Sequence, residues 1–257
     1  MNKVEARQMG RSEGMSGLAK GLAVLEAFAR QPALTIADAA RATGATRAAA
    51  RRCLLTLADL GYVAFDGKFF RPLPRVLRLG CGISESLPLP QVAQPILDKA
   101  RDELNESISL AVLDGTDALF VARAEALRLV STVVKIGASL PAFCSATGRV
   151  LLGALPDGRV KDIIRRSNLV QHTPNTLVDP LAILTAIRTA RQSGYAMSNE
   201  ELEPGLISMA VPVVDRTGQT KAAMSVSASS ARIHFDRMPS VILPVLQRHA
   251  NILSKSL

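Results

Sequence analysis

Hydrophobic positions in the first third of the chain repeat with the three-to-four-residue spacing of amphipathic helices. Residues 18–30 form one such pattern, residues 35–43 a second and residues 46–60 a third. Three short helical patterns in this order predict a small helical domain at this end of the chain. The predicted core stripe of the first helix comprises Leu18, Leu22, Leu25 and Phe28.

The second and third helical patterns have clear boundaries. Thr35 stands three residues before Asp38, which is close to a capping box, and Thr46 can cap the third helix. Between them Gly44 supplies the backbone freedom that a sharp turn between helices requires. Gly61 follows the third helix, where a glycine commonly ends one. These boundaries predict a helix-turn-helix, whose second helix reads the major groove of DNA.

The third helix separates an apolar face from a basic face at 100° per residue. Arg51, Arg52 and Ala48 lie opposite the apolar face, and Arg47 lies at the edge of this basic side. The small residues Ala48 and Ala49 on it let the helix backbone approach the floor of the DNA groove. Arginine can bind a phosphate or the O6/N7 edge of guanine. For a helix alone, an ordinary solvated basic face is the alternative. The predicted core face comprises Ala50, Cys53, Leu54, Leu57 and Leu60.

A hairpin follows the third helix. Residues 62–65 and 68–71 are apolar-rich runs on either side of Asp66-Gly67, which is a strong hairpin signal. A helix-turn-helix with a basic hairpin predicts a winged helix, and this favours DNA binding over a solvated face. The residues expected to contact DNA are Thr46, Arg47, Ala48, Arg51, Arg52, Lys68 and Arg71.

The charge distribution supports nucleic acid as the partner of this domain. Residues 1–80 hold thirteen Lys and Arg against six Asp and Glu, or +7, whereas residues 81–257 hold eighteen against sixteen, or +2. An excess confined to one domain indicates a polyanion bound there. No stretch has the wide apolar face beside a lysine-rich face that a membrane surface requires, and a winged helix that docks protein is less consistent with this charge. We expect double-stranded DNA with a palindromic operator, bound by a homodimer or a dimer of dimers.

Composition indicates an intracellular protein. No apolar run reaches the roughly 18 residues of a membrane span, and the first residues lack the apolar region of a signal peptide. The three cysteines are widely spaced and odd in number, which predicts neither a disulfide framework nor a metal site. We therefore expect a cytoplasmic location, no metal and no cofactor. Residues 1–16 are polar and without period, and are predicted to be a mobile tail, with a DNA-contacting arm as the alternative.

The chain is predicted to divide into a winged helix-turn-helix domain at residues 17–74, a linker helix at 75–90 and an effector-binding domain at 91–257, with residues 87–90 as the clearest linker. The fold class is α+β, with a largely antiparallel sheet in the second domain. Helices are predicted at residues 91–106, 147–155, 157–166, 180–193 and 235–256. Strands are predicted at residues 107–112, 118–123, 129–135, 195–198, 207–214 and 220–227.

The second domain lacks the local signatures of an enzyme. It contains no nucleophile elbow, no phosphate-binding loop and no dinucleotide fingerprint, and its histidines lie apart. We therefore expect no catalytic residue, and the rival interpretation is a small-molecule enzyme or sensor with a winged-helix appendage. Residues 145–148 open a helix, where free N–H groups favour an anion. Ser225 and Ser227 share one face of a strand. Such features fit a pocket for a small carboxylate, and helix capping is the plainer alternative.

Five segments in this order resemble the IclR family of bacterial transcriptional regulators. They are GLAVLEAFAR (21–30), TRAAARRCLLTLADLGYV (46–63), LPAFCSATGRVLLGAL (140–155), residues 175–218 and AAMSVSASSAR (222–232). The likeness covers nearly the whole chain from about residue 17. RAAARRCLLTLADLGYV, DGKFFRPLPRVLRLG and AVLDG look most like the subgroup that controls protocatechuate and β-ketoadipate-pathway genes.

This resemblance implies a winged helix-turn-helix followed by a GAF-like α/β effector domain. It also implies a small organic acid effector, aromatic or β-ketoadipate-like, that alters operator binding or RNA polymerase recruitment and so controls catabolic genes. A regulator of another carbon pathway that senses a short keto acid is the alternative. Arg123 and Lys135 are the candidate cations for the acid, with a surface ion pair as the alternative for each. The effector pocket implied by matching motif positions comprises Leu129, Thr132, Ala146, Thr147, Ser198, Ser208, Ser225 and Ser227.

Where this chain has Ser198 and Ser208, family pockets often have an acidic residue or a cysteine. Where it has Ala146 and Thr147, the subgroup often shows Ser-Met. A serine-rich lining changes the hydrogen bonding offered to a ligand, so the identity of a relative's effector does not transfer to this chain directly.

Overall fold

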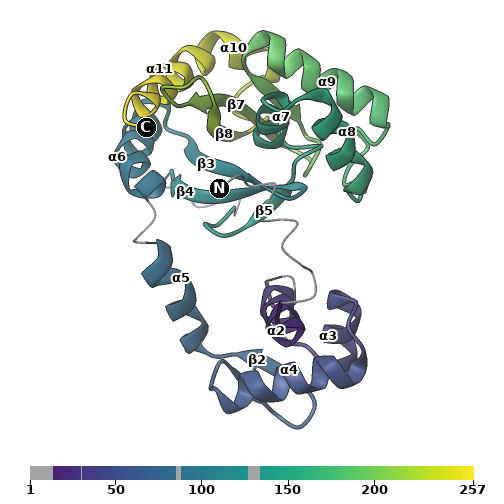
Figure 1. Ribbon diagram of the computed structural model, residues 1–257. Helices are drawn as coiled ribbons and strands as arrows, with labels where there is room; N and C mark the ends of the chain where they lie inside the picture. The colour runs from purple at the N-terminus through teal and green to yellow at the C-terminus, as the bar shows by residue number, and fades with distance from the viewer. Residues whose placement is uncertain (1–13, 30, 85–87, 127–133) are drawn as a thin grey trace. The chain divides into compact units, whose positions relative to one another are not determined.

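The computed structural model describes residues 14–29, 31–84, 88–126 and 134–257. The chain divides into two compact units, residues 1–86 and residues 87–257 (Figure 1). Leu129 and Thr132, with most of the strand predicted at 129–135, lie outside the described residues.

The first unit is a winged helix-turn-helix (Figure 1). Three helices are followed by a two-stranded antiparallel hairpin in which Phe65 pairs with Phe70. The predicted order of elements is confirmed. The elements are α2 (Ser16–Ala27), α3 (Ile36–Thr43), α4 (Arg47–Asp59), β1 (Val63–Phe65) and β2 (Phe70–Pro72).

The helix boundaries follow the predicted local signals. The hydroxyl of Thr35 accepts a hydrogen bond from the Asp38 N–H at 3.2 Å, and the Asp38 carboxylate accepts one from the Thr35 N–H at 3.0 Å, which completes a capping box. Gly44 ends α3 with a φ of 67°, in the left-handed region that glycine adopts without strain. Thr46 then caps α4 by accepting from the Ala49 N–H at 3.2 Å. These contacts fix the turn between the two helices.

The predicted core stripe of α2 is wrong in its first half. Leu18 and Leu22 are 60% and 51% exposed, and Val24 and Ala27 point into the core beside Phe28. The helix carries apolar residues on two faces. Spacing alone cannot say which face packs, because both have a helical period.

Two further positions on α4 differ from the prediction. Leu60, predicted in the core, caps the end of the helix and is 51% exposed. Ala49, predicted on the outer face, is buried. Ala50, Leu54 and Leu57 pack into the core as predicted, and Cys53 lies partly buried at its border.

Helix was predicted at residues 75–90, and the structure has it there in separate segments. A short helical turn, η1 (Pro74–Val76), leads into α5 (Leu77–Ser84), and α6 (Pro88–Leu104) follows. The segment 87–90, predicted as a linker, thus holds the start of α6. Proline is compatible with the first turn of a helix because the N–H it lacks has no partner there.

The second unit is built on a six-stranded sheet in the order β5-β4-β3-β8-β7-β6, and every neighbouring pair is antiparallel. The predicted antiparallel sheet is therefore confirmed, and the short edge strand β5 is an addition to it. The strands are β3 (Ser107–Asp114), β4 (Asp117–Ala124), β5 (Ser139–Pro141), β6 (Ala196–Asn199), β7 (Leu206–Val214) and β8 (Thr220–Ser229).

The C-terminal segment forms separate helices instead of the single helix predicted at 235–256. Pro239 and Pro244 each lie in the first turn of a helix, and Ile242 separates the two helices. A proline in a helix interior would leave a carbonyl without its partner, so the chain restarts the helix at each one. The remaining helical elements are α7 (Ala146–Gly153), α8 (Asp157–Arg166), α9 (Pro180–Ser193), η2 (Phe235–Arg237), α10 (Met238–Val241) and α11 (Leu243–Ser254).

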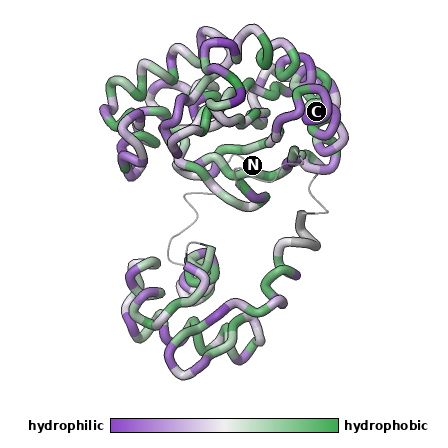
Figure 2. The backbone as a smooth tube through the Cα atoms, turned by 180° about the vertical axis from the view of Figure 1, so that it is seen from behind, coloured by the Kyte–Doolittle hydropathy of each residue, from purple (hydrophilic) through white to green (hydrophobic). Residues whose placement is uncertain are grey.

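Helices cover both faces of the sheet (Figure 1). On one face α6, α10 and α11 bury residues such as Leu97, Met238 and Leu246 against the strands. On the other face α7 packs through Val150 and Leu151, with α8 and α9 stacked behind it. Hydrophobic and hydrophilic residues alternate at short intervals along the chain (Figure 2). Among the described residues, no helix combines the length and the apolar character of a membrane span.

Candidate functional site

The exposed face of α4 carries the cations predicted to contact DNA. Arg47, Ala48 and Arg51 are exposed on this helix. The Thr46 hydroxyl at the helix start accepts from the Ala49 N–H and keeps its own proton available for an outside acceptor. The small Ala48 side chain leaves room for close approach of a groove floor.

The wing is a stiff hairpin with cations on its surface. The Asp66 carboxylate accepts from the backbone N–H of Phe69 at 2.7 Å and of Lys68 at 3.0 Å, and these two bonds hold the pKa of Asp66 below its usual range. The Lys68 Nζ lies 5.2 Å from the centre of the Phe69 ring, and the Arg71 guanidinium lies 5.7 Å from it. Both cations are exposed. The wing thus presents two cations on its surface, and the Arg71 Nε lies 3.6 Å from the Asp66 carboxylate.

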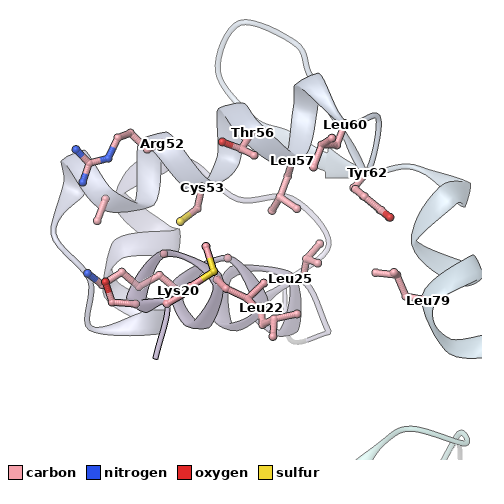
Figure 3. A pocket seen from close by; sticks show the side chains of 16 residues that line it. Lys20, Leu22, Leu25, Arg52, Cys53, Thr56, Leu57, Leu60, Tyr62 and Leu79 are labelled. Carbon is pink, nitrogen blue, oxygen red and sulfur yellow. The ribbon is translucent and has the colours of Figure 1, made fainter. Parts of the chain in front are cut away.

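Arg52 has different surroundings. It is exposed, but it also borders an apolar groove between α2 and α4, and Figure 3 shows it at one end of that groove with Lys20. The groove is mainly apolar, and Leu18, Leu22 and Leu60 contribute their exposed side chains to it. The residues labelled in Figure 3 are Lys20, Leu22, Leu25, Arg52, Cys53, Thr56, Leu57, Leu60, Tyr62 and Leu79.

The second unit contains a cavity between its sheet and the start of α7. The cavity is small, with a volume of about 40 Å³. Its lining comprises Ser109, Phe120, Arg123, Val134, Leu140, Ser145, Ala146, Thr147, Leu202, Leu206, Ser208, Ser225, Val226 and Ser227.

The floor of the cavity is set by strand register. Ser109 on β3 pairs with Arg123 on β4 and with Ser225 on β8, so these three residues form one row across the sheet. In the next row Ser227 on β8 pairs with Ser208 on β7. Directly opposite residues on antiparallel strands share a face. The floor therefore carries a cation beside a field of hydroxyl groups.

An irregularity in the sheet adds an aromatic wall. The register between β3 and β4 shifts between Leu110 and Ala111, so that Val121 is skipped. A bulge of this kind re-aims the side chains on one side of it. It places Phe120 and Arg123, three residues apart, in the lining of the same cavity.

Arg123 is a buried cation. Its side chain is 7% exposed, its Nη1 donates to the Ser109 Oγ at 3.1 Å, and its Nη2 lies 3.9 Å from the Glu125 carboxylate. Desolvation is the largest effect on its pKa and lowers it, and the Glu125 charge opposes that shift.

The start of α7 packs closely on the segment before it. The Ser145 hydroxyl accepts from the Gly148 N–H at 3.1 Å and donates to the Pro141 carbonyl at 2.9 Å. A Cβ added to Gly148 would lie 2.2 Å from the Ala142 Cα, so only glycine fits. Ala146 and Thr147, at this helix start, line the cavity and are almost fully buried.

The structure brings together six of the residues predicted to bind an effector, and places others elsewhere. Ser198 does not line the cavity, and its buried hydroxyl donates to the Cys144 carbonyl at 3.2 Å. Lys135 is exposed and does not line it either. The six lining residues are Arg123, Ala146, Thr147, Ser208, Ser225 and Ser227.

Sequence reasoning missed the other lining residues. Two of these residues had a usable signal: Ser109 alternates with Ser107 on one face of a predicted strand, and Ser145 stands at a predicted helix start. The wall residues come from four strands and two loops and share no local pattern. They are Phe120, Val134, Leu140, Leu202, Leu206 and Val226, with Ser145 at the helix start.

Cys144 and His249 are buried. Burial raises the pKa of the Cys144 thiol to about 12, so it stays protonated. His249 is 6% exposed, and its Nε2 lies 3.1 Å from the Glu103 carboxylate. Within the described ranges, no group of three or more His, Cys, Asp or Glu is placed to hold a metal ion.

Both units match family models. Residues 17–67 match the IclR helix-turn-helix domain, and residues 81–255 match the bacterial transcriptional regulator IclR C-terminal domain.

Relatives with assigned roles are transcriptional regulators. The chain is 42% identical to the Pca regulon regulatory protein of Pseudomonas putida, over 90% of this chain and 80% of the relative. It is 37% identical to the p-hydroxybenzoate hydroxylase transcriptional activator of Acinetobacter baylyi, over 93% and 90%.

Solved structures agree with this assignment. A putative transcriptional regulator from Rhodococcus sp. RHA1 is 40% identical with a TM-score of 0.76, over 94% of this chain and 97% of that one. The inducer-binding domain of PobR from Acinetobacter, a double mutant in complex with 3-hydroxybenzoic acid, is 32% identical with a TM-score of 0.63, over 66% and 100%. With both of its units matched, the chain belongs to the IclR family of bacterial transcriptional regulators.

Proposed function

We propose that this protein is a DNA-binding regulator of catabolic genes that responds to a small aromatic carboxylate. DNA binding is assigned to residues 17–74 and effector binding to residues 91–257. The observation that carries the proposal is the cavity of the second unit, with the buried cation Arg123 among serine hydroxyls and the ring of Phe120 in its wall. A charged head on a flat apolar body fits such a lining.

The relatives support the aromatic class. One of them is named as the transcriptional activator of p-hydroxybenzoate hydroxylase, and the PobR domain was solved in complex with 3-hydroxybenzoic acid. The serines of this chain's cavity set its preference within that class. We propose no catalytic role for the protein, and we place its action in the cytoplasm with its DNA.

The DNA contacts divide between base reading and phosphate binding. Arg47 and Arg51, exposed on α4, are assigned to the major groove, and the small Ala48 lets the helix approach. Thr46 binds a phosphate of the DNA at the start of α4. Arg52 lies beside the major groove of the DNA. Lys68 and Arg71 hold the wing to the backbone.

We propose further that the protein binds DNA as a homodimer. The supporting observation is the apolar groove of the first unit, where Leu18, Leu22 and Leu60 are at least half exposed. Exposed apolar patches of this kind mark protein interfaces. The Leu22→Asp variant should shift the oligomer distribution toward monomer in analytical ultracentrifugation, and Ile252→Asp, at an exposed apolar site of the other unit, should not. An unchanged distribution for Leu22→Asp would place the dimer contact elsewhere.

Selection of binding sites from random DNA by the purified full chain tests the main proposal. Enriched sequences should be palindromic, and their affinity should change when 4-hydroxybenzoate or protocatechuate is added. Arg51→Ala should lower affinity for the selected site by about tenfold or more and leave effector binding intact. Arg165→Ala, exposed in the second unit, is the control. Failure to enrich any sequence, or equal loss of DNA and effector binding in Arg51→Ala, would contradict the proposal.

A further inference from the structure

The two faces of the wing carry different side chains. Phe70 is 1% exposed in the core of the first unit, and its strand partner Phe65 lies on the same face. Arg71 pairs with Ala64 and lies on the opposite face, because successive residues of a strand alternate between faces. The Arg71 guanidinium lies 5.7 Å from the centre of the Phe69 ring, which places that ring on the side of the wing away from the core.

Phe69 is an aromatic residue that the core does not use. It is partly buried, yet it belongs to none of the hydrophobic clusters formed by the described residues. The Lys68 Nζ lies over its ring at 5.2 Å from the centre, which is within the range of a cation–π contact, as is the Arg71 guanidinium. The ring is thus placed beside two cations on the surface of the wing.

The backbone that carries this ring is held by Asp66. The Asp66 carboxylate accepts from the N–H of Phe69 at 2.7 Å and from the N–H of Lys68 at 3.0 Å. The Asp66 N–H donates to the Phe69 carbonyl at 3.1 Å. Both backbone polar groups of Phe69 are therefore bonded within the turn, and these bonds set the direction in which the ring leaves it.

Arg71 has a second neighbour besides the ring. Its Nε lies 3.6 Å from the Asp66 carboxylate, and the side chains of Arg71 and Asp66 are 57% and 47% exposed. An exposed ion pair of this kind contributes little energy by itself. Asp66 and Phe69 thus both restrict the Arg71 side chain, and its guanidinium remains accessible to DNA.

Restriction of these side chains favours binding to DNA. Lysine and arginine each have a large rotamer freedom, which is lost when the cation is held at one phosphate. A contact that already restricts the side chain in the free protein reduces that loss, and so strengthens binding without a new contact to the DNA. The negative face of an aromatic ring can supply such a contact.

We propose that Phe69 is a positioning residue of the wing, whose ring holds Lys68 and Arg71 in the orientation in which they reach the DNA backbone. The residue acts through these two cations and reads no base itself. This inference rests on the proposed function, which assigns Lys68 and Arg71 to the phosphates. It adds an uncharged side chain to the determinants of DNA affinity.

A ring of the same shape with an altered charge distribution tests the proposal. Pentafluorophenylalanine at position 69 keeps the shape of the side chain, but its fluorine atoms withdraw the negative charge from the ring face. The affinity of the full chain for a random-sequence DNA duplex, measured by fluorescence anisotropy, should fall about threefold to tenfold. Phe69→Leu should give a similar loss, whereas Phe69→Tyr, which keeps the ring face, should not. The slope of log affinity against log salt should stay unchanged in all three, because every charge remains.

Two controls separate the contact with the cations from a general effect on the wing. Phe65→Leu, at the half-exposed aromatic residue on the other face of the hairpin, should leave DNA affinity unchanged. In a background that combines Lys68→Ala with Arg71→Ala, Phe69→Leu should have no further effect, because the cations through which the ring acts are absent.

The outcomes distinguish this inference from the function on which it rests. Unchanged affinity with pentafluorophenylalanine, or a loss in Phe69→Leu that persists without the two cations, would overturn the positioning role. If the combined Lys68→Ala and Arg71→Ala variant kept the affinity and the salt slope of the unaltered chain, the phosphate contacts of the proposed function would themselves be contradicted.

Discussion

Arg149 of α7 and Glu201 of the loop after β6 form a buried ion pair with two hydrogen bonds. The Arg149 Nη1 lies 2.5 Å from Oε1 and the Nη2 lies 2.7 Å from Oε2, with the two side chains 5% and 7% exposed. The Arg149 Nε donates to the Phe143 carbonyl, and Glu201 also accepts from the Leu177 N–H. The pair thus ties α7, whose first turn lines the cavity, to the loop that carries Leu202.

Breaking this pair from one side should destabilise the second unit strongly. Arg149→Met leaves the Glu201 charge buried without its partner, and the expected cost is about 3–5 kcal/mol in the free energy of unfolding. Urea denaturation followed by circular dichroism measures it. A double-mutant cycle with Glu201→Gln should give a coupling of at least about 2 kcal/mol. Additive losses would show that the two residues stabilise the unit independently.

Gly148 and Gly158 offer a contrast between a packed and an open glycine. Both lie in helices, α7 and α8, but a Cβ at Gly148 would lie 2.2 Å from backbone, whereas nothing lies within 4 Å at Gly158. Gly148→Ala should cost at least about 3 kcal/mol of stability and distort the cavity wall. Gly158→Ala should be neutral or stabilising by up to about 1 kcal/mol, because alanine favours helix. Thermal unfolding measures the stability of both variants. Equal stabilities would contradict the close packing of Gly148 against Ala142.

Lys68 on the wing should act through charge alone. Lys68→Ala should weaken binding to all DNA sequences by a similar factor and reduce the slope of log affinity against log salt by about one. Fluorescence anisotropy at several salt concentrations measures both quantities. Lys161→Ala, exposed on α8 of the other unit, should leave the slope unchanged. A slope for Lys68→Ala equal to that of the unaltered chain would remove Lys68 from the phosphate contacts.

The capping box of α3 should make part of the first unit's stability depend on pH. Hydrogen bonds from the Thr35 side chain, and then from its backbone, hold the pKa of Asp38 below its usual range. A depressed pKa means that the contribution is complete above the unfolded value, about 3.9, and is lost as pH falls through the folded value. The melting temperature of Asp38→Ala should lie below that of the unaltered chain at pH 6, and the difference should shrink below about pH 4. A difference that stays constant into acid would show that the carboxylate charge does not matter.

The first unit was largely readable from the sequence because its signals are local. Thr35 with Asp38, Gly44 and Thr46 each act within three or four residues, and Asp66-Gly67 specifies a hairpin turn by its own backbone preference. Periodicity failed at Leu18 and Leu22. An apolar stripe kept on the surface has the same spacing as one in the core, so burial cannot be derived from the pattern.

The effector cavity was predicted only in part. Ser225 and Ser227 alternate along one strand, and Ser145 and Thr147 stand at a helix start, which local sequence can show. Arg123, Ser109 and Ser225 lie in one row because three strands pair with one another. Ser109 and Ser225 are 116 residues apart in the sequence. The bulge that brings Phe120 to the same cavity, and the path of the chain that sends Ser198 to the Cys144 carbonyl, have no local signal.

The sequence by itself determined the order of elements, the helix caps, the wing and the concentration of positive charge in the first unit, because short-range backbone preferences and composition are sufficient for these. Only the tertiary structure decided which apolar faces are buried and which side chains meet in the cavity. Those depend on strand register and on buried contacts such as that between Arg149 and Glu201, where residues distant in the chain are brought together by the fold as a whole.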